Sequence, residues 1–262
     1  GIGLVNKDDE HAPQIIKAAN CELYTYSEES KEADFVASDI RYVSQPDFVG
    51  TEFHISGKYD MEVRLGIPGL FNVVNALAAV SVCSFLGLDQ ARISHALENI
   101  RVNGRMEIVY TSERCTVLVD YAHNAVSMES LLSTLRDYKP KRLVCVFGCG
   151  GNRSKDRRYS MGEIGGKMAD LSIITADNSR YEKVEDIIAD IRGSIEKTGG
   201  KFIEIPDRRE AIRYSILHAQ PGDMVAVIGK GHEDYQEING VRHHFLDREV
   251  IEETVKELGE KA

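Results

Sequence analysis

The residues best suited to chemistry in this chain lie between Leu143 and Arg158. The apolar run Leu143–Phe147 predicts a buried strand of a parallel sheet. Three glycines and four cations follow it at once: Gly148, Gly150, Gly151, Arg153, Lys155, Arg157 and Arg158. Glycine lets the backbone turn sharply and approach a ligand, and open α/β sheets bind ligands at the carboxyl ends of their strands. In a chain of formal net charge -10 the pattern indicates a bound anion; the alternative is a solvated turn.

Three other predicted strands end in polar residues of a similar kind. Their sequences are D-Y-A-H (Asp120–His123), D-N-S-R (Asp177–Arg180) and G-K-G-H-E (Gly229–Glu233). Each alone is compatible with an ordinary turn, but the carboxyl ends of parallel strands meet at one edge of a sheet. Together they supply acids, amides, cations and bare backbone. That mixture suits a zwitterion, with arginine for its carboxylate and acidic side chains for its ammonium group.

Several sharper motifs are absent from the sequence. Gly229–Gly231 lacks the spacing and the hydroxyl of a P-loop, and His232 has no second histidine four residues later for an H-E-x-x-H metal site. The pair Gly148 and Gly150 lacks the third glycine of a dinucleotide-binding fingerprint. Asp120 could support acid–base chemistry together with the histidine that ends D-Y-A-H, but the spacing places no nucleophile beside them. We therefore assign no catalytic residue and no metal site.

The elements that must position these residues alternate regularly from Arg105 onward. The predicted strands are Thr116–Val119, Leu143–Phe147, Leu171–Thr175, Lys201–Ile205 and Met224–Ile228. Two helices are predicted by apolar stripes at helical spacing, one formed by Met128, Leu131, Leu132 and Leu135 and the other by Ile187, Ile188, Ile191 and Ile195. A capping box at Ser160 and Glu163 predicts the start of another helix, and Asp207 with Glu210 predicts the start of a fourth. The last predicted helix is Asp247–Leu258. Ile238–Val241 is a hairpin signal. This alternation predicts an α/β domain with a mostly parallel sheet covered by helices on both faces.

The first part of the chain reads differently. Its predicted strands are Ile2–Val5, Glu22–Tyr26, Phe35–Val36, Thr51–Ser56 and Met61–Leu65, the last two forming a hairpin. The apolar segment Phe71–Leu86 predicts a buried helix, and Asp89 predicts the N-cap of the next one. Asn72 and Asn75 share one face of the first turn, and their amides need backbone or ligand partners. We place a domain boundary at Gly104, giving domains 1–104 and 105–262.

Composition narrows the class of protein. The net charge of -10 and the pI near 5.4 argue against a nucleic-acid-binding surface. No apolar run approaches the roughly 18 residues of a membrane span, and the first residues lack a signal-peptide pattern. Five cysteines, an odd number without a C-x-x-C motif, indicate reduced thiols in a cytoplasmic protein.

Taken in order, the motifs resemble those of the Mur ligase family. They are L-F-N-V-V-N-A-L-A-A, G-R-M-E, D-Y-A-H, V-F-G-C-G-G-N-R, D-N-x-R, G-K-G-H-E-x-Y-Q and F-x-D-R-E, and they span essentially the whole chain. The resemblance implies the C-terminal half of a central ATPase domain followed by a Rossmann-like, mostly parallel sheet domain. It also implies ATP- and Mg²⁺-dependent amide bond formation in peptidoglycan synthesis. In that reaction, an amino acid is added to UDP-N-acetylmuramoyl-L-alanyl-D-glutamate through an acyl phosphate.

The resemblance further implies roles for individual residues. The amino-acid substrate would contact Arg153, Asp177, Asn178, Ser179, Arg180, Gly229 and Glu233. ATP would contact Asn72, Asn75, Arg105, Asp120 and Lys155. In this family an arginine at the end of D-N-x-R goes with meso-diaminopimelate, because its guanidinium clamps the distal carboxylate, so Arg180 predicts that substrate rather than lysine. Two departures are Ser179, where proline is usual, and Asn124–Val126, which replace T-P-D.

Some parts of the family pattern have no counterpart in this sequence. They are the uridine-nucleotide domain and the first half of the ATPase domain, with its P-loop, Mg²⁺ ligands and modified lysine. We therefore expect a monomeric C-terminal fragment that is inactive alone. Two alternatives remain: a folylpolyglutamate synthase-like ligase, and a non-catalytic amino-acid-binding module.

Overall fold

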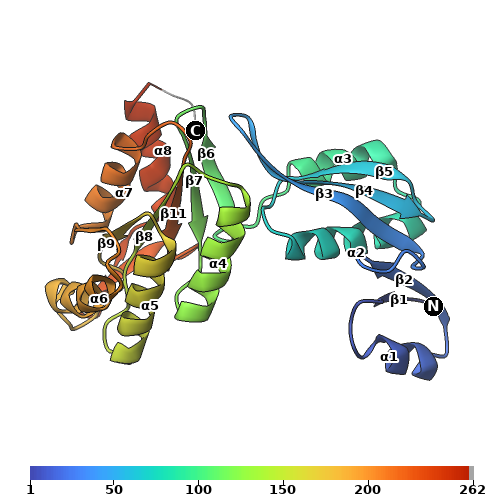
Figure 1. The fold of residues 1–262 in the computed structure, drawn as a ribbon, viewed down its shortest axis with the longest axis horizontal. Coiled ribbons are helices and arrows are strands. Elements are labelled where there is room, and N and C mark those ends of the chain that lie inside the picture. Colours follow the sequence, from blue (N-terminus) through green and yellow to red (C-terminus); the bar gives the residue numbers. More distant parts are fainter. Residues whose placement is uncertain (260–262) are drawn as a thin grey trace. The chain divides into compact units, whose positions relative to one another are not determined.

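The computed structural model of the protein describes residues 1–259. They divide into two compact units, one formed by Gly1–Ser44 with Phe48–Arg101 and the other by Gln45–Asp47 with the chain from Val102 onward. Figure 1 colours both units along the sequence. Within the described residues, no helix is both long and apolar enough to cross a membrane. Each unit has its own sheet and its own hydrophobic core.

The first unit is built on a five-stranded sheet whose strands follow the order of the sequence. They are β1 (Ile2–Asn6), β2 (Glu22–Ser27), β3 (Phe35–Gln45), β4 (Phe48–Gly57) and β5 (Met61–Leu65). The helices are α1 (Ala12–Ala18), α2 (Phe71–Phe85) and α3 (Gln90–Glu98). β2 is parallel to both β1 and β3, whereas β4 and β5 form the predicted antiparallel hairpin. Helix α1 was not predicted, since its seven residues are too few to show a helical period.

The prediction of a fully buried α2 is wrong. Val73, Leu77 and Val80 are buried in the core of the unit, but the side chain of Phe71 is 54% exposed and that of Val82 is 49% exposed. An apolar sequence sets the helix but not which faces are covered, because burial depends on what packs against it. The predicted cap of α3 is confirmed: the Asp89 carboxylate accepts the N–H of Arg92 at 3.3 Å.

The second unit contains a six-stranded sheet in the order β10-β9-β8-β11-β7-β6. The strands are β6 (Glu107–Thr111), β7 (Cys115–Asp120), β8 (Arg142–Phe147), β9 (Leu171–Ile174), β10 (Phe202–Glu204) and β11 (Asp223–Ile228). Five of them are parallel, and β6 adds an antiparallel edge that was not predicted. Every residue of β7 and β11 is buried, which explains why these strands read as continuous apolar runs.

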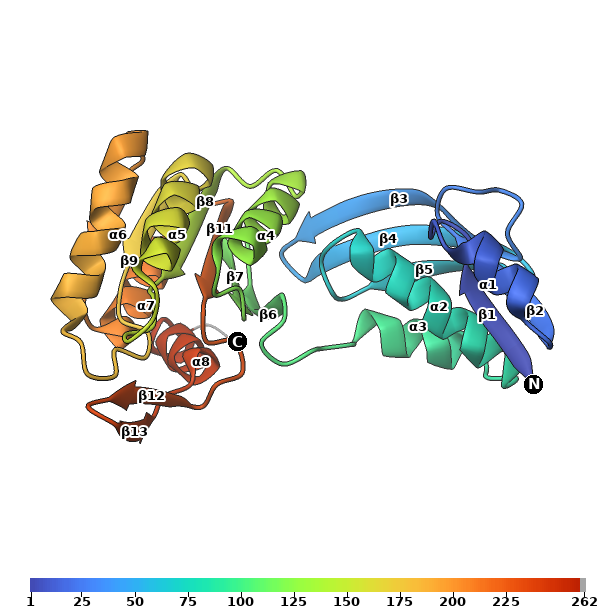
Figure 2. The ribbon, with the colours of Figure 1, turned by 90° about the horizontal axis from the view of Figure 1, so that it is seen from below.

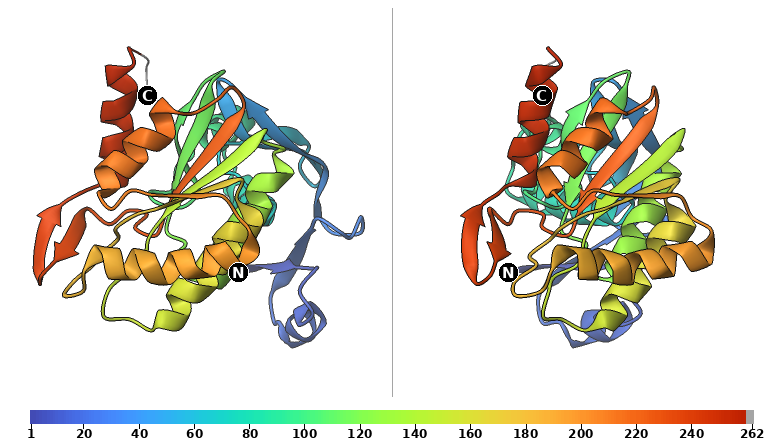
Figure 3. Two further views of the ribbon diagram at one scale, coloured as in Figure 1. Left: turned by 60° about the vertical axis from the view of Figure 1, so that its left-hand side comes forward. Right: turned by 90° about the vertical axis from the view of Figure 1, so that its left-hand side faces the viewer.

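Helices cover both faces of this sheet, as the alternation predicts (Figure 2). α4 (Ala125–Asp137), α5 (Lys155–Met168) and α6 (Val184–Thr198) form one layer, and α7 (Arg208–Leu217) packs beside α8 (Asp247–Glu257) on the other face. The predicted apolar stripes of α4 and α6 are buried throughout. The hairpin of β12 (Tyr235–Ile238) and β13 (Val241–His244) projects away from both layers (Figure 3). Its turn residues Asn239 and Gly240 have φ of 50° and 76°, the conformation that Asn-Gly favours.

The predicted capping box at Ser160 and Glu163 is wrong. Helix α5 begins at Lys155, and its N-cap is Ser154, whose side chain accepts the N–H of Asp156. The Ser160 hydroxyl instead donates to the carbonyl of Asp156 at 2.8 Å, one turn back in the same helix. The first turn of α5 is polar, so the apolar period that marks a helix starts only after it. Three of the cations after the glycines, Lys155, Arg157 and Arg158, therefore belong to the beginning of α5, whereas Arg153 precedes its N-cap.

Candidate functional site

The carboxyl ends of β7, β8, β9 and β11 open into one cavity of about 280 Å³. Its lining includes every residue predicted to bind the amino acid except Ser179, namely Arg153, Asp177, Asn178, Arg180, Gly229 and Glu233. Ser179 is buried and does not line the cavity. Four further lining residues, Tyr121, His123, Cys149 and Arg157, are not among those that the family resemblance assigns to the amino acid. The strand order thus brings together four motifs that lie far apart in the sequence.

Two loops of this cavity are joined through their backbones. The N–H of Gly151 donates to the carbonyl of Asn178 at 2.9 Å. A Cβ atom at Gly151 would lie 1.9 Å from the carbonyl oxygen of Ser179, and one at Gly148 would lie 2.1 Å from that of Thr175. Glycine is therefore required at both positions by a neighbouring loop. The expected approach to a ligand is possible at Gly148 and Gly150, which line the cavity.

The four cations after the glycines do not act as one cluster. Arg153 and Arg157 line the cavity. Lys155 lies outside its lining and pairs with Asp190, with Nζ 3.1 Å from Oδ2. Arg158 is buried, and its guanidinium binds Glu182 at 2.8 Å and Asp190 at 2.9 Å. Two of these cations therefore line the cavity and remain candidates for the predicted anion site, whereas the other two hold α5 to residues further along the chain.

A buried ammonium group connects two sides of the cavity. Lys230 is fully buried, and its Nζ lies 3.4 Å from Oδ1 of Asn178 and 3.3 Å from Oε2 of Glu233. It also donates to the carbonyl oxygen of Tyr235. A buried charge needs such partners, so Lys230 fixes the side chains of two predicted binding residues. The sequence does not predict this role, because the partner Asn178 lies 52 residues away along the chain.

Arg180 has an unusual backbone conformation, and its side chain is held by a hydrogen bond to a neighbouring loop. Its φ is 51°, in the left-handed region that non-glycine residues rarely adopt. Its Nη1 donates to the carbonyl of Gly151 at 2.7 Å. With Arg153 it places positive charge in the same cavity as the carboxylates of Asp177 and Glu233. The cavity can therefore bind the carboxylate and the ammonium group of one zwitterion.

The residues predicted to contact ATP are divided between the two units. Asp120 accepts the N–H groups of Met106 at 2.8 Å and Ala122 at 2.7 Å, and its burial raises the pKa of the carboxyl group. The guanidinium of Arg105 lies 5.0 Å from the centre of the Tyr121 ring.

The two predicted asparagines belong to the first unit. The amide nitrogen of Asn72 donates to the carbonyl of Pro68 at 2.7 Å, and that of Asn75 donates to the side chain of Asn72 at 3.4 Å. Both amides therefore have partners within the chain. Their contact with ATP stays a prediction, as do those of Arg105, Asp120 and Lys155.

The cavity contains no activated nucleophile or metal centre among the described residues. Burial raises the pKa of the Cys149 thiol to about 12, which keeps it protonated and unreactive at neutral pH. The Nδ1 of His123 is 2.9 Å from the carbonyl oxygen of Tyr121. Within residues 1–259, no group of three or more His, Cys, Asp or Glu side chains is arranged to hold a metal ion. These residues by themselves do not fit a magnesium centre.

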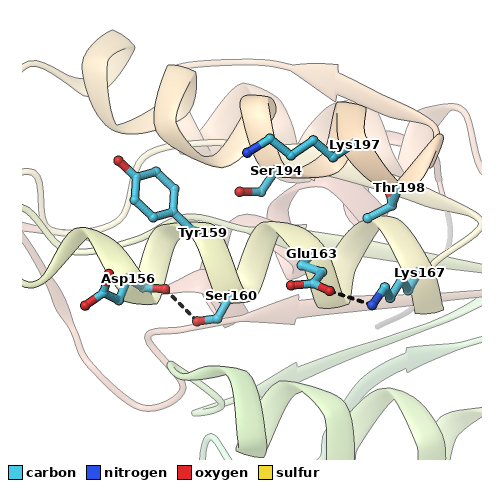
Figure 4. Close-up of a pocket in the computed structure, with 8 residues that line it drawn as sticks. All are labelled: Asp156, Tyr159, Ser160, Glu163, Lys167, Ser194, Lys197 and Thr198. Carbon is cyan, nitrogen blue, oxygen red and sulfur yellow. Dashed lines mark hydrogen bonds and ion pairs between the residues drawn. The ribbon is translucent and has the colours of Figure 1, made fainter.

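A second hollow of about 550 Å³ lies between α5 and α6 (Figure 4). It contains none of the predicted site residues. The Glu163 carboxylate and the Lys167 ammonium group pair with each other, and the hydroxyl of Thr198 donates to the carbonyl of Ile195 at 2.7 Å. These polar groups already have partners, so the cavity at the strand ends is the better candidate site.

Comparison with known proteins matches two successive parts of the chain to two domains of one family. The Mur ligase middle domain matches residues 1–83, and the Mur ligase glutamate ligase domain matches residues 104–231. A relative from Caldanaerobacter subterraneus is 37% identical over 259 residues, covering 97% of this chain and 52% of the relative. One from Trichormus variabilis is 41% identical over 253 residues, covering 95% and 50%. Both are named UDP-N-acetylmuramoyl-L-alanyl-D-glutamate–2,6-diaminopimelate ligase.

Solved structures also match this chain. A structure of a ligase with that name has a TM-score of 0.80 and 34% identity, and the match covers 99% of this chain and 54% of that one. Folylpolyglutamate synthase from Thermotoga maritima has a TM-score of 0.63 at 21% identity over 86% of this chain and 50% of its own, which shows a shared fold alone. The chain spans about half the length of the curated relatives it matches. Because the two family domains together account for most of its residues, the chain belongs to the Mur ligase family.

Proposed function

We propose that the protein containing this chain is an ATP-dependent ligase of peptidoglycan synthesis. It adds meso-diaminopimelate to UDP-N-acetylmuramoyl-L-alanyl-D-glutamate, and the cavity of the second unit holds the diaminopimelate. The observation that carries the proposal is the meeting of Arg153 and Arg180 with Asp177 and Glu233 around one cavity. The names of the relatives support the same reaction. Because the chain spans half their length, the activity is proposed for the whole protein.

The charges of the cavity match the chemistry of this substrate. meso-Diaminopimelate carries an ammonium group and a carboxylate at each end, so it needs partners of both signs. In our proposal Arg180 binds the distal carboxylate, and Asp177 and Glu233 bind ammonium. Hydrogen bonds to charged groups contribute about 1.5–3 kcal/mol each. L-Lysine lacks the distal carboxylate, so the guanidinium of Arg180 would lose its ligand partner, and a binding site built for polar contacts penalises such a loss strongly.

ATP and Mg²⁺ are the cofactors of this proposal. When bound, they would supply the phosphoryl group that activates the glutamate carboxylate. Arg105 is the best placed of the predicted ATP contacts, because Asp120 and Lys155 already have partners within the chain. The P-loop and the magnesium ligands would come from residues outside this chain. A monomer in the cytoplasm is the state that we propose for the protein.

The test is a ligation assay on the complete protein with meso-diaminopimelate, L-lysine or L-glutamate as the acceptor. We expect product with meso-diaminopimelate. Arg180→Ala should raise its KM by about 10- to 100-fold, the loss of one or two charge-assisted hydrogen bonds. Arg192→Ala is the matched control, since Arg192 forms an ion pair with Glu204 and does not line the cavity. Preferred use of lysine or glutamate, or an unchanged KM in Arg180→Ala, would overturn the proposal.

A further inference from the structure

The strand β12 lies along the D-N-S-R loop and is bonded to it at successive residues. The side chain of Gln236 donates to the carbonyl of Asp177 at 3.0 Å, and the N–H of Glu237 donates to Oδ1 of Asn178 at 2.9 Å. The N–H of Arg180 then donates to the carbonyl of Glu237 at 3.0 Å. Arg180 and Ile238 form a parallel bridge, so the loop pairs with the hairpin as a short extra strand. The hairpin therefore sets the backbone of Arg180.

The same hairpin also holds the guanidinium of Arg180. Oε2 of Glu237 lies 3.5 Å from Nε of Arg180, and both side chains are about one-fifth exposed, at 22% and 23%. Nη1 of the same guanidinium donates to the carbonyl oxygen of Gly151. Nη2 makes no hydrogen bond to the part of the chain that the structure describes. Nε and Nη1 thus have partners, and Nη2 can donate to a ligand in the cavity that Arg180 lines.

Two opposing effects of Glu237 have to be compared. An arginine side chain loses rotamer entropy when it is immobilised, and a charge-assisted contact at Nε supplies this ordering before a ligand binds. The negative charge of Glu237 would also repel a ligand carboxylate. Glu237 does not line the cavity, and its carboxylate lies against Nε of the guanidinium. The ordering effect should therefore exceed the repulsion.

We propose that Glu237 is a specificity-determining positioning residue. It holds the guanidinium of Arg180 so that Nη2 meets the distal carboxylate of the amino-acid substrate. This inference rests on the proposed function, in which Arg180 binds that carboxylate. Glu237 acts through Arg180 and does not itself contact the substrate.

The experiment compares Glu237→Ala and Glu237→Gln in the complete protein by steady-state ligation. Glu237→Ala should raise the KM for meso-diaminopimelate about five- to tenfold, because a charge-assisted contact is lost, with kcat within about twofold. Glu237→Gln keeps an oxygen that accepts from Nε and should restore most of the wild-type KM. The KM values for ATP and the nucleotide substrate should not change. Glu204→Ala, which breaks a similar pair with Arg192 3.1 Å away, is the matched control.

A double-variant cycle separates positioning from a general structural effect. If Glu237 acts through Arg180, Glu237→Ala should have no further effect in an Arg180→Ala background. An unchanged or lowered KM in Glu237→Ala, independent effects in the double variant, or an equal rise in KM for all three substrates would overturn the inference. Failure of the proposed function is visible separately, because Arg180→Ala alone would then leave the KM for meso-diaminopimelate unchanged.

Discussion

Arg208 and Asp247 form a completely buried, two-pronged ion pair in the second unit. Nε and Nη2 of the guanidinium lie 2.7 Å from Oδ1 and Oδ2 of the carboxylate. The same guanidinium donates to the carbonyls of Ala176 at 3.2 Å and Ile228 at 3.0 Å. These carbonyls directly precede Asp177 and Gly229 in the sequence, so the pair joins α7 and α8 to the two strand ends where the candidate site begins.

Replacing Arg208 by methionine should strongly destabilise the protein. Asp247 would remain buried without a partner, and breaking a buried pair in this way costs about 3–5 kcal/mol. Urea denaturation measures the change in the free energy of unfolding. The double variant Arg208→Met/Asp247→Leu removes both charges and should recover at least half of the loss. A double variant as unstable as the sum of its single variants would contradict this account.

Alanine at Gly151 should damage both stability and binding. Its Cβ would meet the carbonyl oxygen of Ser179 at 1.9 Å, so one of the two loops must move. Overpacking of this kind costs about 1–3 kcal/mol. We also expect the KM for the amino acid to rise at least about tenfold, because a small displacement of the binding groups disrupts their geometry. Gly193→Ala in α6 is the control, because a Cβ there meets nothing within 4 Å. That change should stabilise the protein by about 0.5–1 kcal/mol in thermal or chemical denaturation.

Glu182 should make the stability of the protein depend on acid pH. The N–H of Asn152 and then the guanidinium of Arg158 bind its carboxylate and hold its pKa below the usual 4.5. Because the pKa of Glu182 is lower in the folded state than in the unfolded state, its ionised carboxylate stabilises the folded state at pH values above the unfolded pKa. This stabilisation is lost as the pH falls through the pKa of the folded state. Wild-type protein should therefore lose more stability than Glu182→Gln between about pH 5 and pH 3. Equal losses in denaturation curves at the two pH values would show that Glu182 contributes nothing to this dependence.

Local features of the fold could be predicted well from the sequence. The strand Met61–Leu65, the Asp89 cap, the Asp207 cap and the Ile238–Val241 hairpin are all confirmed, because each depends on residues a few positions apart. The Asp207 carboxylate, for example, accepts the N–H of Glu210 at 3.0 Å. Membership of the Mur ligase family, read from the order of the motifs, is confirmed as well. The roles of individual site residues and the domain boundary at Gly104 stay predictions.

Only the tertiary structure decided which polar groups face the cavity. Arg153 lines it and Lys155 does not, because the partner of Lys155 is Asp190, 35 residues further along the chain. Lys230 and Glu237 have their roles for the same reason, because each also contacts a loop more than 50 residues away. By itself the sequence determined the elements and the motifs at their ends, since those follow from local spacing. Whether a polar side chain faces the cavity or binds a neighbouring loop depends on contacts between residues far apart in the sequence. The local spacing of residues does not predict such contacts.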